Sequence, residues 1–388
     1  MVKKVLIVGG GIAGLSAAWA CAQRGMAVEL FEQGALPNPR SSSFDEHRVI
    51  RHAYGRMAGY TRLMPEAYRI WERLWAATGR SHYEPCGTVV FLRQDDDWYD
   101  VVARSLDELS IDHHEVALDE VSTRFPMIRE DGLVRVVETG GAGILFPIPI
   151  LTDLVVLLGG LGIGLHSHCR VDEVDPVKGT VRIGSTIHEG DVVVVAGGAW
   201  ADRLVSDLRP AVLPSRQAVL YLAPPPALAE AWSKAPVMID AAAGGGLYAL
   251  PPRCGTRLKI GDHSFSRRGN PDDDRFATDL DLERLWGPAR TALRDFESYT
   301  LLERKACFYT VHDREEFQVR PTGPRGWVIS ACSGHGFKLG PLMGELTARA
   351  ITGEMDPETL PPIAAGRAID MAWNIEVPVI AGSTDLTL

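Results

Sequence analysis

The sequence predicts an α/β protein: a doubly wound, Rossmann-like domain is built from separate stretches of the chain, and a second, β-rich α+β domain is inserted into it. Three observations predict this class. A strand, a glycine-rich turn, a helix and a second strand follow one another in the first 32 residues. Two later apolar runs also end in glycines. The length of 388 residues exceeds the size at which one hydrophobic core usually stops growing, so two domains are expected.

The first unit has the pattern of a dinucleotide-binding βαβ motif. Residues 5–8 form a continuous apolar run, as in a parallel strand covered on both faces. A glycine-rich turn, an alanine-rich helix through residue 22 and a strand at 27–32 follow. The motif residues are Gly9, Gly11 and Gly14, for the tight turn, the approach to a pyrophosphate and the helix–strand packing, and Glu32, for a ribose diol. This pattern predicts a bound dinucleotide and leaves FAD and NAD both open.

The remaining elements divide the chain between two domains. The apolar runs at 191–198 and 327–334 are expected to be further strands of the nucleotide domain, and a helix at 60–75 carries the chain away from it. Short apolar runs between Gly, Pro and Asp clusters are typical of a β-rich domain. The expected FAD-binding domain comprises residues 1–85, 144–212 and 300–388, and the expected substrate domain comprises residues 86–143 and 213–299.

Composition excludes several classes of protein. Forty Lys and Arg against fifty Asp and Glu give a formal charge of -10 without a basic block, so nucleic acid is not an expected partner. Six scattered cysteines lack CxxC spacing, and reduced thiols are expected. His166 and His168 would share one face of a strand, but four ligands are not evident nearby, so no metal is expected.

Nothing in the sequence has the pattern of a targeting or membrane segment. The N-terminus lacks the apolar region and cleavage site of a signal peptide. The most apolar stretch, 148–165, contains Pro149, Asp153 and several glycines, which is typical of a buried helix and turn. We therefore expect a soluble, cytoplasmic protein with no membrane partner.

Four segments carry a family resemblance. They are residues 41–54, with the sequence SSSFDEHRVIRHAY, residues 259–263 (KIGDH), residues 305–310 (KACFYT) and residues 333–338 (SGHGFK). Together they resemble the monomeric sarcosine oxidase and N-methyltryptophan oxidase family, flavoenzymes related to D-amino acid oxidase. The clear resemblance covers residues 1–75, about 190–202, 248–263 and 303–350. It favours FAD over NAD and is compatible with a monomer.

The resemblance implies a set of cofactor contacts. In the family, a cysteine at the position of Cys307 carries FAD through a thioether to the 8α-methyl carbon, so covalent FAD is implied. Arg48 is placed against the flavin, and the turn before the predicted helix near residue 339 is placed at the flavin N1–C2=O edge, where negative charge grows on reduction. The implied contacts are Ser42, Ser43 and Arg48 at the flavin, Gly198 and Trp200 at the adenine side, and Gly334, Gly336, Phe337 and Lys338 at the N1 edge.

The resemblance also implies roles at the substrate. Arg51 and Lys338 grip a carboxylate, since a guanidinium binds carboxylate bidentately and lysine adds a point charge. Arg48 and Arg51 are three apart and so can share one side of a helical turn. Lys259, in an apolar segment where a lysine usually snorkels to the surface, is implied to activate oxygen next to flavin N5. His263 and Tyr248 are implied to line the substrate cavity.

Two departures from the family affect the substrate. Phe44 stands where sarcosine-type enzymes have a histidine near the flavin, and Leu250 stands where an aromatic residue often borders the substrate. The expected reaction is therefore oxidation of a C–N bond in a secondary or cyclic amino acid, or an imino acid, other than sarcosine itself. Hydride passes to flavin N5, and O2 becomes H2O2. The alternatives are a flavin dehydrogenase with a quinone or protein acceptor, an NAD-dependent dehydrogenase and a noncatalytic flavin-binding protein.

Overall fold

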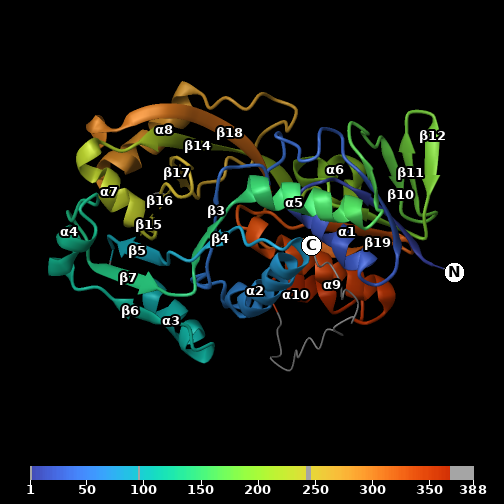
Figure 1. The fold of residues 1–388 in the computed structure, drawn as a ribbon, viewed down its shortest axis with the longest axis horizontal. Coiled ribbons are helices and arrows are strands. Elements are labelled where there is room, and N and C mark those ends of the chain that lie inside the picture. Colours follow the sequence, from blue (N-terminus) through green and yellow to red (C-terminus); the bar gives the residue numbers. More distant parts are fainter. Residues whose placement is uncertain (1, 95–96, 242–245, 368–388) are drawn as a thin grey trace, which may run out of the picture.

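The first sheet is the frame of the nucleotide domain (Figure 1). The computed structural model describes residues 2–94, 97–241 and 246–367. The six-stranded sheet has the order β19-β20-β13-β1-β2-β9, and its pairs are parallel except for the antiparallel pair of β19 and β20. The strands are β1 (Lys4–Val8), β2 (Ala27–Phe31), β9 (Gly164–His166), β13 (Val192–Val195), β19 (Gln318–Gly323) and β20 (Gly326–Ser330). The predicted parallel strands are thus confirmed.

Helices cover one face of this sheet. They are α1 (Ile12–Ala22), α2 (Ala58–Thr78), α5 (Pro147–Gly160), α9 (Gly340–Thr352) and α10 (Leu360–Ala364). Their apolar side chains share one core with the sheet, in which Leu15, Trp71 and Leu346 are buried. The apolar segment at 148–165 forms α5 in this layer, as predicted. In the described part of the chain, none of the helices combines the length and apolarity needed to cross a membrane.

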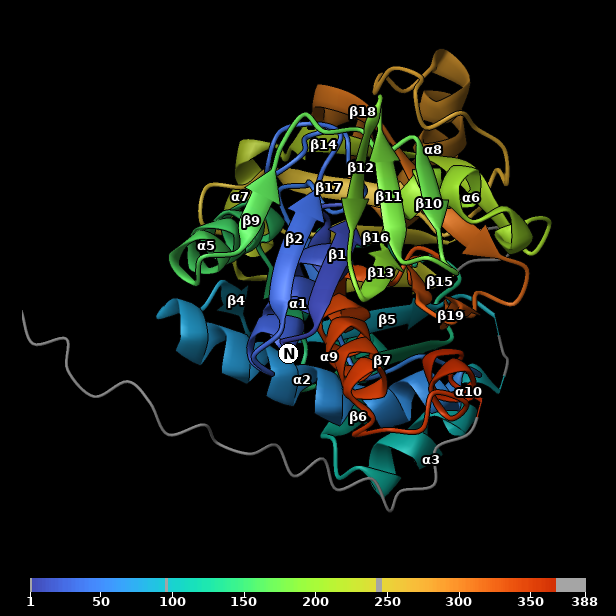
Figure 2. The ribbon, with the colours of Figure 1, turned by 90° about the vertical axis from the view of Figure 1, so that its right-hand side faces the viewer.

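A small antiparallel sheet covers the opposite face (Figure 2). Its strands are β10 (Glu173–Asp175), β11 (Thr180–Ile183) and β12 (Thr186–Glu189), and the short helix α6 (Ala201–Leu204) lies beside them. Leu6 and Val193 of the large sheet pack with Val181 of β11 and with Leu208 in one apolar cluster. The central strands are therefore buried on both sides, which explains why their sequences are continuous apolar runs.

The second domain is built on an eight-stranded sheet with the order β18-β14-β17-β16-β15-β5-β7-β6. The strands are β5 (Thr88–Leu92), β6 (His113–Glu115), β7 (Arg135–Thr139), β14 (Val212–Ala223), β15 (Val237–Ala241), β16 (Leu247–Leu250), β17 (Leu258–Asp262) and β18 (Thr300–His312). The helices α4 (Val121–Arg124), α7 (Pro226–Lys234) and α8 (Asp279–Ala292) pack their buried side chains into its core. The helix α3 (Trp98–Glu108) packs against α2. Figure 1 shows this sheet beside the nucleotide domain.

One long strand lies on the other side of the expected boundary. β18 pairs with β14 along its whole length, from Thr300 to His312. By strand pairing, residues 300–312 therefore belong to the second sheet and not to the FAD-binding domain, in which the sequence placed them. The sequence placed this boundary wrongly because β18 extends past the edge of the second domain. Its last residues, Tyr309 and Thr310, reach the cavity of the first domain.

A three-stranded sheet joins the two domains and changes one prediction. It consists of β3 (Arg48–Ile50), β8 (Gly143–Leu145) and β4 (Tyr83–Glu84). Because Arg48 pairs with Leu145 in an extended strand, the helical turn expected to hold Arg48 and Arg51 on one side does not form. The expectation that His166 and His168 share a strand face is also wrong, since β9 ends at His166 and His168 has a φ of 55°.

Candidate active site

The glycine turn after β1 is shaped by close backbone contacts. A Cβ atom on Gly9, whose φ is 111°, would lie 2.3 Å from the carbonyl oxygen of Ala196. A Cβ on Gly14 would lie 1.9 Å from the carbonyl oxygen of Gly9. Only glycine fits at these two positions, since any side chain would push the turn away from β13 or lift α1 off β1. The turn thus brings the beginning of α1 to the carboxyl end of the parallel strands.

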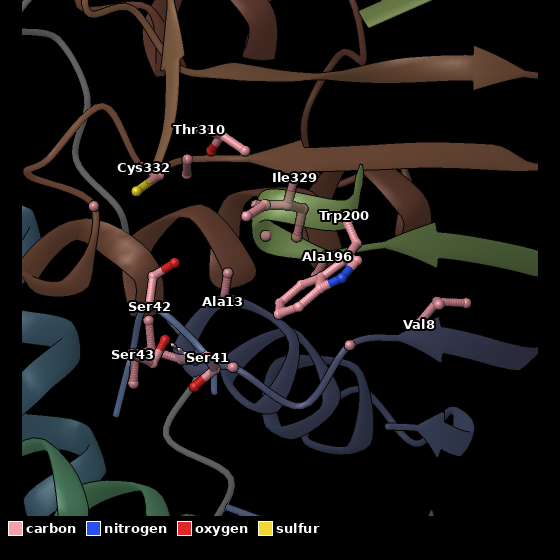
Figure 3. Close-up of a pocket in the computed structure, with 18 of the residues that line it drawn as sticks. Val8, Ala13, Ser41, Ser42, Ser43, Ala196, Trp200, Thr310, Ile329 and Cys332 are labelled. Atoms are coloured by element: carbon pink, nitrogen blue, oxygen red, sulfur yellow. Dashed lines mark hydrogen bonds between the residues drawn. The ribbon is translucent and has the colours of Figure 1, made fainter. Parts of the chain in front are cut away.

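A cavity opens at this end of the sheet (Figure 3). In the close-up, Ser41, Ser42 and Ser43 face it from one loop, Ala196 and Trp200 from the segment after β13, and Ile329 and Cys332 from the end of β20. A parallel sheet binds its ligand at the carboxyl ends of its strands, where the connections diverge. The predicted residues that line the cavity are Gly9, Gly11, Glu32, Ser42, Ser43, Arg48, Gly198, Trp200, Gly334, Gly336, Phe337 and Lys338.

The other predicted residues lie around the cavity without lining it. Gly14 is packed against the turn, as its contact with Gly9 requires. The remaining five are Arg51, Tyr248, Lys259, His263 and Cys307, which surround the end where Lys338 and Arg48 lie. The structure therefore brings the predicted cofactor residues together and places the predicted substrate residues next to them.

The cavity fits a dinucleotide at its glycine end. The first turn of α1 has no acidic residue of its own, and the positive end of the helix faces the cavity. The hydroxyl of Ser43 accepts a hydrogen bond from the Ile12 N–H at 3.1 Å. The Glu32 carboxylate accepts hydrogen bonds from Gly10 N (2.7 Å), Gly34 N (2.9 Å) and Asn38 Nδ2 (2.8 Å). A carboxylate has about four acceptor positions, so Glu32 can still accept a hydrogen bond from a ribose hydroxyl.

Several residues that line the cavity carry no sequence motif. The segment after β9 contributes Cys169, Arg170, Val171 and Asp172, and α6 contributes Arg203. Asp272, on the connection between β17 and α8, holds both Trp200 Nε1 (2.7 Å) and Arg203 Nη1 (2.6 Å) in place. The one feature of the sequence that could have predicted the residues after β9 is their position directly after a strand of the parallel sheet. The strand itself, β9, is three residues long and does not stand out as an apolar run.

A buried cluster of charges surrounds Asp45. Its Oδ2 lies 3.0 Å from Lys259 Nζ and also accepts a hydrogen bond from Arg48, while Tyr221 donates to Oδ1. Lys259 is 1% exposed, so it does not snorkel to the surface. Burial lowers the pKa of Lys259 to about 8, although Asp45 opposes that shift. Burial alone would raise the pKa of Asp45, but Arg48 and Lys259 hold it well below its usual range.

Arg51 and Lys338 form a second group of buried basic side chains. Burial and the nearby Arg51 and Arg48 hold the pKa of Lys338 well below its ordinary value. Arg51 Nη1 donates to the Ala53 carbonyl at 2.6 Å, and the charged groups of Arg51 and Lys338 lie 5.7 and 5.1 Å from the Tyr54 ring centroid. Within the described residues, no carboxylate lies within ion-pair distance of either side chain. This arrangement can bind a carboxylate from outside the chain.

His263 and Tyr248 flank this region. His263 Nε2 lies 2.8 Å from Glu315 Oε2, and more than half of the His263 side chain is exposed. A Cβ on Gly334 would lie 3.4 Å from His263 Cε1, so His263 borders a residue that lines the cavity. The Tyr248 hydroxyl lies over Gly261, where a Cβ would approach it to 2.4 Å. Both side chains can therefore border a small ligand placed between the cavity and the second sheet.

Cys307 lies on β18 opposite Gln217 of β14 and is a free thiol. In a strand, residues two apart point to the same face, so Cys307 shares its face with Tyr309, which lines the cavity. Burial raises the pKa of the Cys307 thiol. Of the two departures from the family, Leu250 is buried opposite Lys259, and Phe44 lies with its ring centroid 5.8 Å from Lys305 Nζ.

Comparison with known proteins identifies the family of the chain. A family model described as FAD dependent oxidoreductase matches residues 4–350. Monomeric sarcosine oxidase from Bacillus sp. (strain B-0618) is 26% identical over 372 residues, covering 91% of this chain and 93% of that protein. N-methyl-L-tryptophan oxidase from Yersinia pestis (strain Pestoides F) is 24% identical over 360 residues, covering 89% and 93%.

Solved structures show a similar fold. L-proline dehydrogenase from P. horikoshii matches with a TM-score of 0.78 and 18% identity, covering 93% of this chain and 97% of that chain. NikD, an unusual amino acid oxidase essential for nikkomycin biosynthesis, matches with a TM-score of 0.77 and 21% identity, covering 93% and 98%. At these identities the likeness concerns the fold alone.

Proposed function

Because the chain belongs to the FAD dependent oxidoreductase family, we propose that it oxidises the C–N bond of a secondary or cyclic amino acid and passes the electrons to O2. The family overturns the alternative of an NAD-dependent dehydrogenase. The observation that carries the proposed substrate class is the pair of Arg51 and Lys338, two buried basic side chains from distant parts of the chain that have no carboxylate partner within the described residues. An amino acid supplies the missing anion.

The residues on the cavity side orient such a substrate. Arg51 and Lys338 hold its carboxylate, while Tyr248 and His263 border its carbon skeleton. The amine binds in its neutral form, so it needs no strong base on the protein. The chemistry that FAD supplies when bound is acceptance of a hydride at N5 and transfer of two electrons to O2, which takes up two protons to form H2O2. The amine loses a hydride and a proton in total, and the resulting imine hydrolyses or rearranges.

Two features of the chain favour negative charge at the N1 edge of the flavin. Without side chains, Gly334 and Gly336 let the backbone of this turn approach the flavin. Gly336 also has no room for a side chain, because a Cβ there would lie 1.8 Å from the Ala331 carbonyl oxygen. The start of α9 adds positive potential there, and so does Lys338 when a bound anion stabilises its protonated form. Gly198 and Trp200 are proposed at the adenine side, and Ser42, Ser43 and Arg48 at the flavin.

Cys307 is the proposed attachment point of FAD. The supporting observation is its place on the same strand face as Tyr309. Cys332 and Cys169 line the cavity directly, whereas Cys307 lies beside it, so these two are the competing attachment points.

Lys259 is the proposed cation for oxygen activation. A fixed positive charge next to the reduced flavin stabilises the negative charge that develops on O2 as it is reduced. The ion pair with Asp45 supports the second candidate function, a dehydrogenase with a quinone or protein acceptor, because a neighbouring carboxylate weakens the field of that cation.

A panel of amines tests both functions. N-methyl amino acids, pipecolate, proline, their unsaturated analogues and the matching amines without a carboxylate are mixed with the holoprotein without oxygen. We expect the visible flavin absorption to bleach with one or more of the acids. Admitting air then separates the functions: an oxidase recovers its colour rapidly and yields one H2O2 per imine, whereas a dehydrogenase recovers only with an added quinone. Absence of bleaching by every amino acid would overturn both.

A further inference from the structure

Asp45 is the one acid that forms an ion pair with Lys259 among the described residues. We propose, resting on the oxidase function above, that Asp45 is a positioning residue that keeps Lys259 in its ammonium form inside the protein and fixes where that ammonium points. In this role Asp45 need not touch the substrate or O2. It acts through Lys259.

The position of Lys259 makes its charge depend on a partner. Lys259 is the second residue of β17, paired with Tyr221 on β14 and with Leu250 on β16, and it is 1% exposed. An ammonium group without a counter-ion in such a place loses its proton rather than stay charged out of water. Burial already lowers its pKa to about 8 with Asp45 present. A nearby carboxylate therefore decides whether Lys259 is charged near neutral pH.

The other groups around Lys259 do not replace Asp45. The titratable or charged side chains near this pair are His47, Arg48, Tyr221, Tyr248, Lys305 and Cys307, together with Glu46, whose carboxylate is already paired with Arg257. Arg48 and Lys305 are cations and oppose a charge on Lys259. Burial lowers the pKa of His47 to about 3, and burial raises the pKa values of Tyr221, Tyr248 and Cys307, so these four are neutral at pH 7. Without Asp45, Arg48 and Lys259 would be neighbouring buried cations.

Hydrogen bonds also fix the direction of the ammonium. The oxygens of Asp45 accept from Lys259, Arg48 and Tyr221 and from the Glu46 N–H at 2.8 Å, so the carboxylate cannot rotate freely. Lys259 donates a second hydrogen bond to the His47 carbonyl. Two of its three N–H groups are thus held by the segment 45–47, and the third is left for another acceptor.

The test compares Asp45→Asn with the wild-type holoprotein. The flavin is photoreduced without substrate, and its reoxidation by O2 is followed from pH 6 to pH 10. We expect the wild-type rate to fall as Lys259 loses its proton. In Asp45→Asn this fall should move at least one pH unit lower, which at pH 9 corresponds to about tenfold slower reoxidation. Lowering the pH should restore the rate of the variant.

A second readout does not depend on turnover. The midpoint potential of the bound flavin, measured by dye equilibration across the same pH range, should show an inflection that shifts in Asp45→Asn and is absent in Lys259→Met. If wild-type reduced flavin does not react with O2, the oxidase function fails, and the potentials still decide the role of Asp45. Unshifted inflections in both readouts would overturn the proposal.

Glu46→Gln is the matched control. Its carboxylate is the neighbour of Asp45 in sequence but binds Arg257, at 2.7 Å from Nε. We expect the wild-type pH profile in this variant, and an equal shift there would overturn a specific role for Asp45. If Asp45→Asn does not fold, adding Lys259→Met removes the buried unpaired cation. Recovery of folded protein supports the pairing, and equal failure of the double variant overturns it.

Discussion

The Glu345 carboxylate on α9 lies 2.8 Å from Arg24 Nη2, just after the end of α1. Glu345 is fully buried and also meets Arg349 at 3.0 Å and Arg73 at 3.6 Å. The two helices that it ties together both begin at the cavity, α1 after the glycine turn and α9 after the Lys338 turn. This ion cluster therefore ties α9 to the end of α1 that lies away from the cavity, and so helps to fix the two helix starts relative to each other.

Replacing Glu345 should destabilise the nucleotide domain. Glu345→Ala leaves three arginines near one another without their shared counter-ion, so we expect a loss of about 3–5 kcal/mol in the free energy of unfolding, measured in urea. Glu354→Ala is the control, because Glu354 also binds Arg24 but is half-exposed. That variant should lose no more than about 1 kcal/mol. Equal losses in the two variants would contradict the assignment.

Replacing Cys307 should release the flavin. In Cys307→Ala, any FAD that binds should leave the protein on acid precipitation, whereas it should stay with the pellet in Cys332→Ala and Cys169→Ala. The two control thiols line the cavity, so they are the residues that could carry the flavin instead. Mass spectrometry of tryptic peptides from wild-type holoprotein provides the check. An unmodified Cys307 peptide together with a flavin on another cysteine would rule this attachment out.

Replacing Arg51 should weaken recognition of the carboxylate. Arg51→Ala removes a charge-assisted contact worth roughly 2–4 kcal/mol, so kcat/KM should fall about 30- to 1000-fold for the best amino acid of the panel. The control is Arg56→Ala, an exposed arginine on the same segment that pairs with Asp97. Its kcat/KM should stay within about twofold of wild type. An amine without an acid group that reacts as well as the amino acid would argue against the assignment.

Replacing Lys259 should separate the two half-reactions. Lys259→Met should leave anaerobic flavin reduction within about tenfold of wild type but slow reoxidation by about 100-fold, a loss of about 3 kcal/mol. Rapid mixing of photoreduced protein with air-saturated buffer measures the second step. Lys305→Met, at a neighbouring cation on β18, serves for comparison and should change reoxidation less. Reoxidation of Lys259→Met at the wild-type rate would contradict the oxygen-activating role and favour a quinone or a protein as the acceptor.

Buried His47 should make the protein less stable in mild acid. Burial lowers its folded pKa to about 3, below the value of about 6.5 in the unfolded chain. Between these two values the unfolded state binds a proton that the folded state does not. His47 therefore contributes a loss of about 2 kcal/mol in the free energy of unfolding from pH 7 to pH 5. His47→Leu should remove that part of the slope, and His114→Gln, at an exposed histidine, should keep it. Parallel slopes in all three proteins would contradict this.

Local patterns were sufficient to predict the nucleotide half of the site. The turn from Gly9 to Gly14 and the acid at Glu32 lie within one βαβ unit. Their spacing along the chain is therefore sufficient to predict that they lie close together in the structure. The apolar runs of β13 and β20 likewise ended where the cavity opens. The spacing of Arg48 and Arg51 gave a wrong prediction, because a spacing of three residues suggests a helix. The strand that pairs with this segment, β8, is about ninety-five residues away, so the local sequence does not show it.

The tertiary structure determined which charged side chains are paired with each other. Lys259 and Asp45 are 214 positions apart, and their ion pair exists because β17 packs against the loop before β3. An apolar segment around a lysine is compatible both with a surface side chain and with a buried ion pair, since spacing says nothing about which acid lies opposite. The sequence by itself thus determined the dinucleotide turn, the strands β1, β2, β13 and β20 of the parallel sheet, and the family. Only the folded chain determined which basic side chains are paired with a carboxylate, as at Asp45, and which have no such partner among the described residues, as at Arg51 and Lys338.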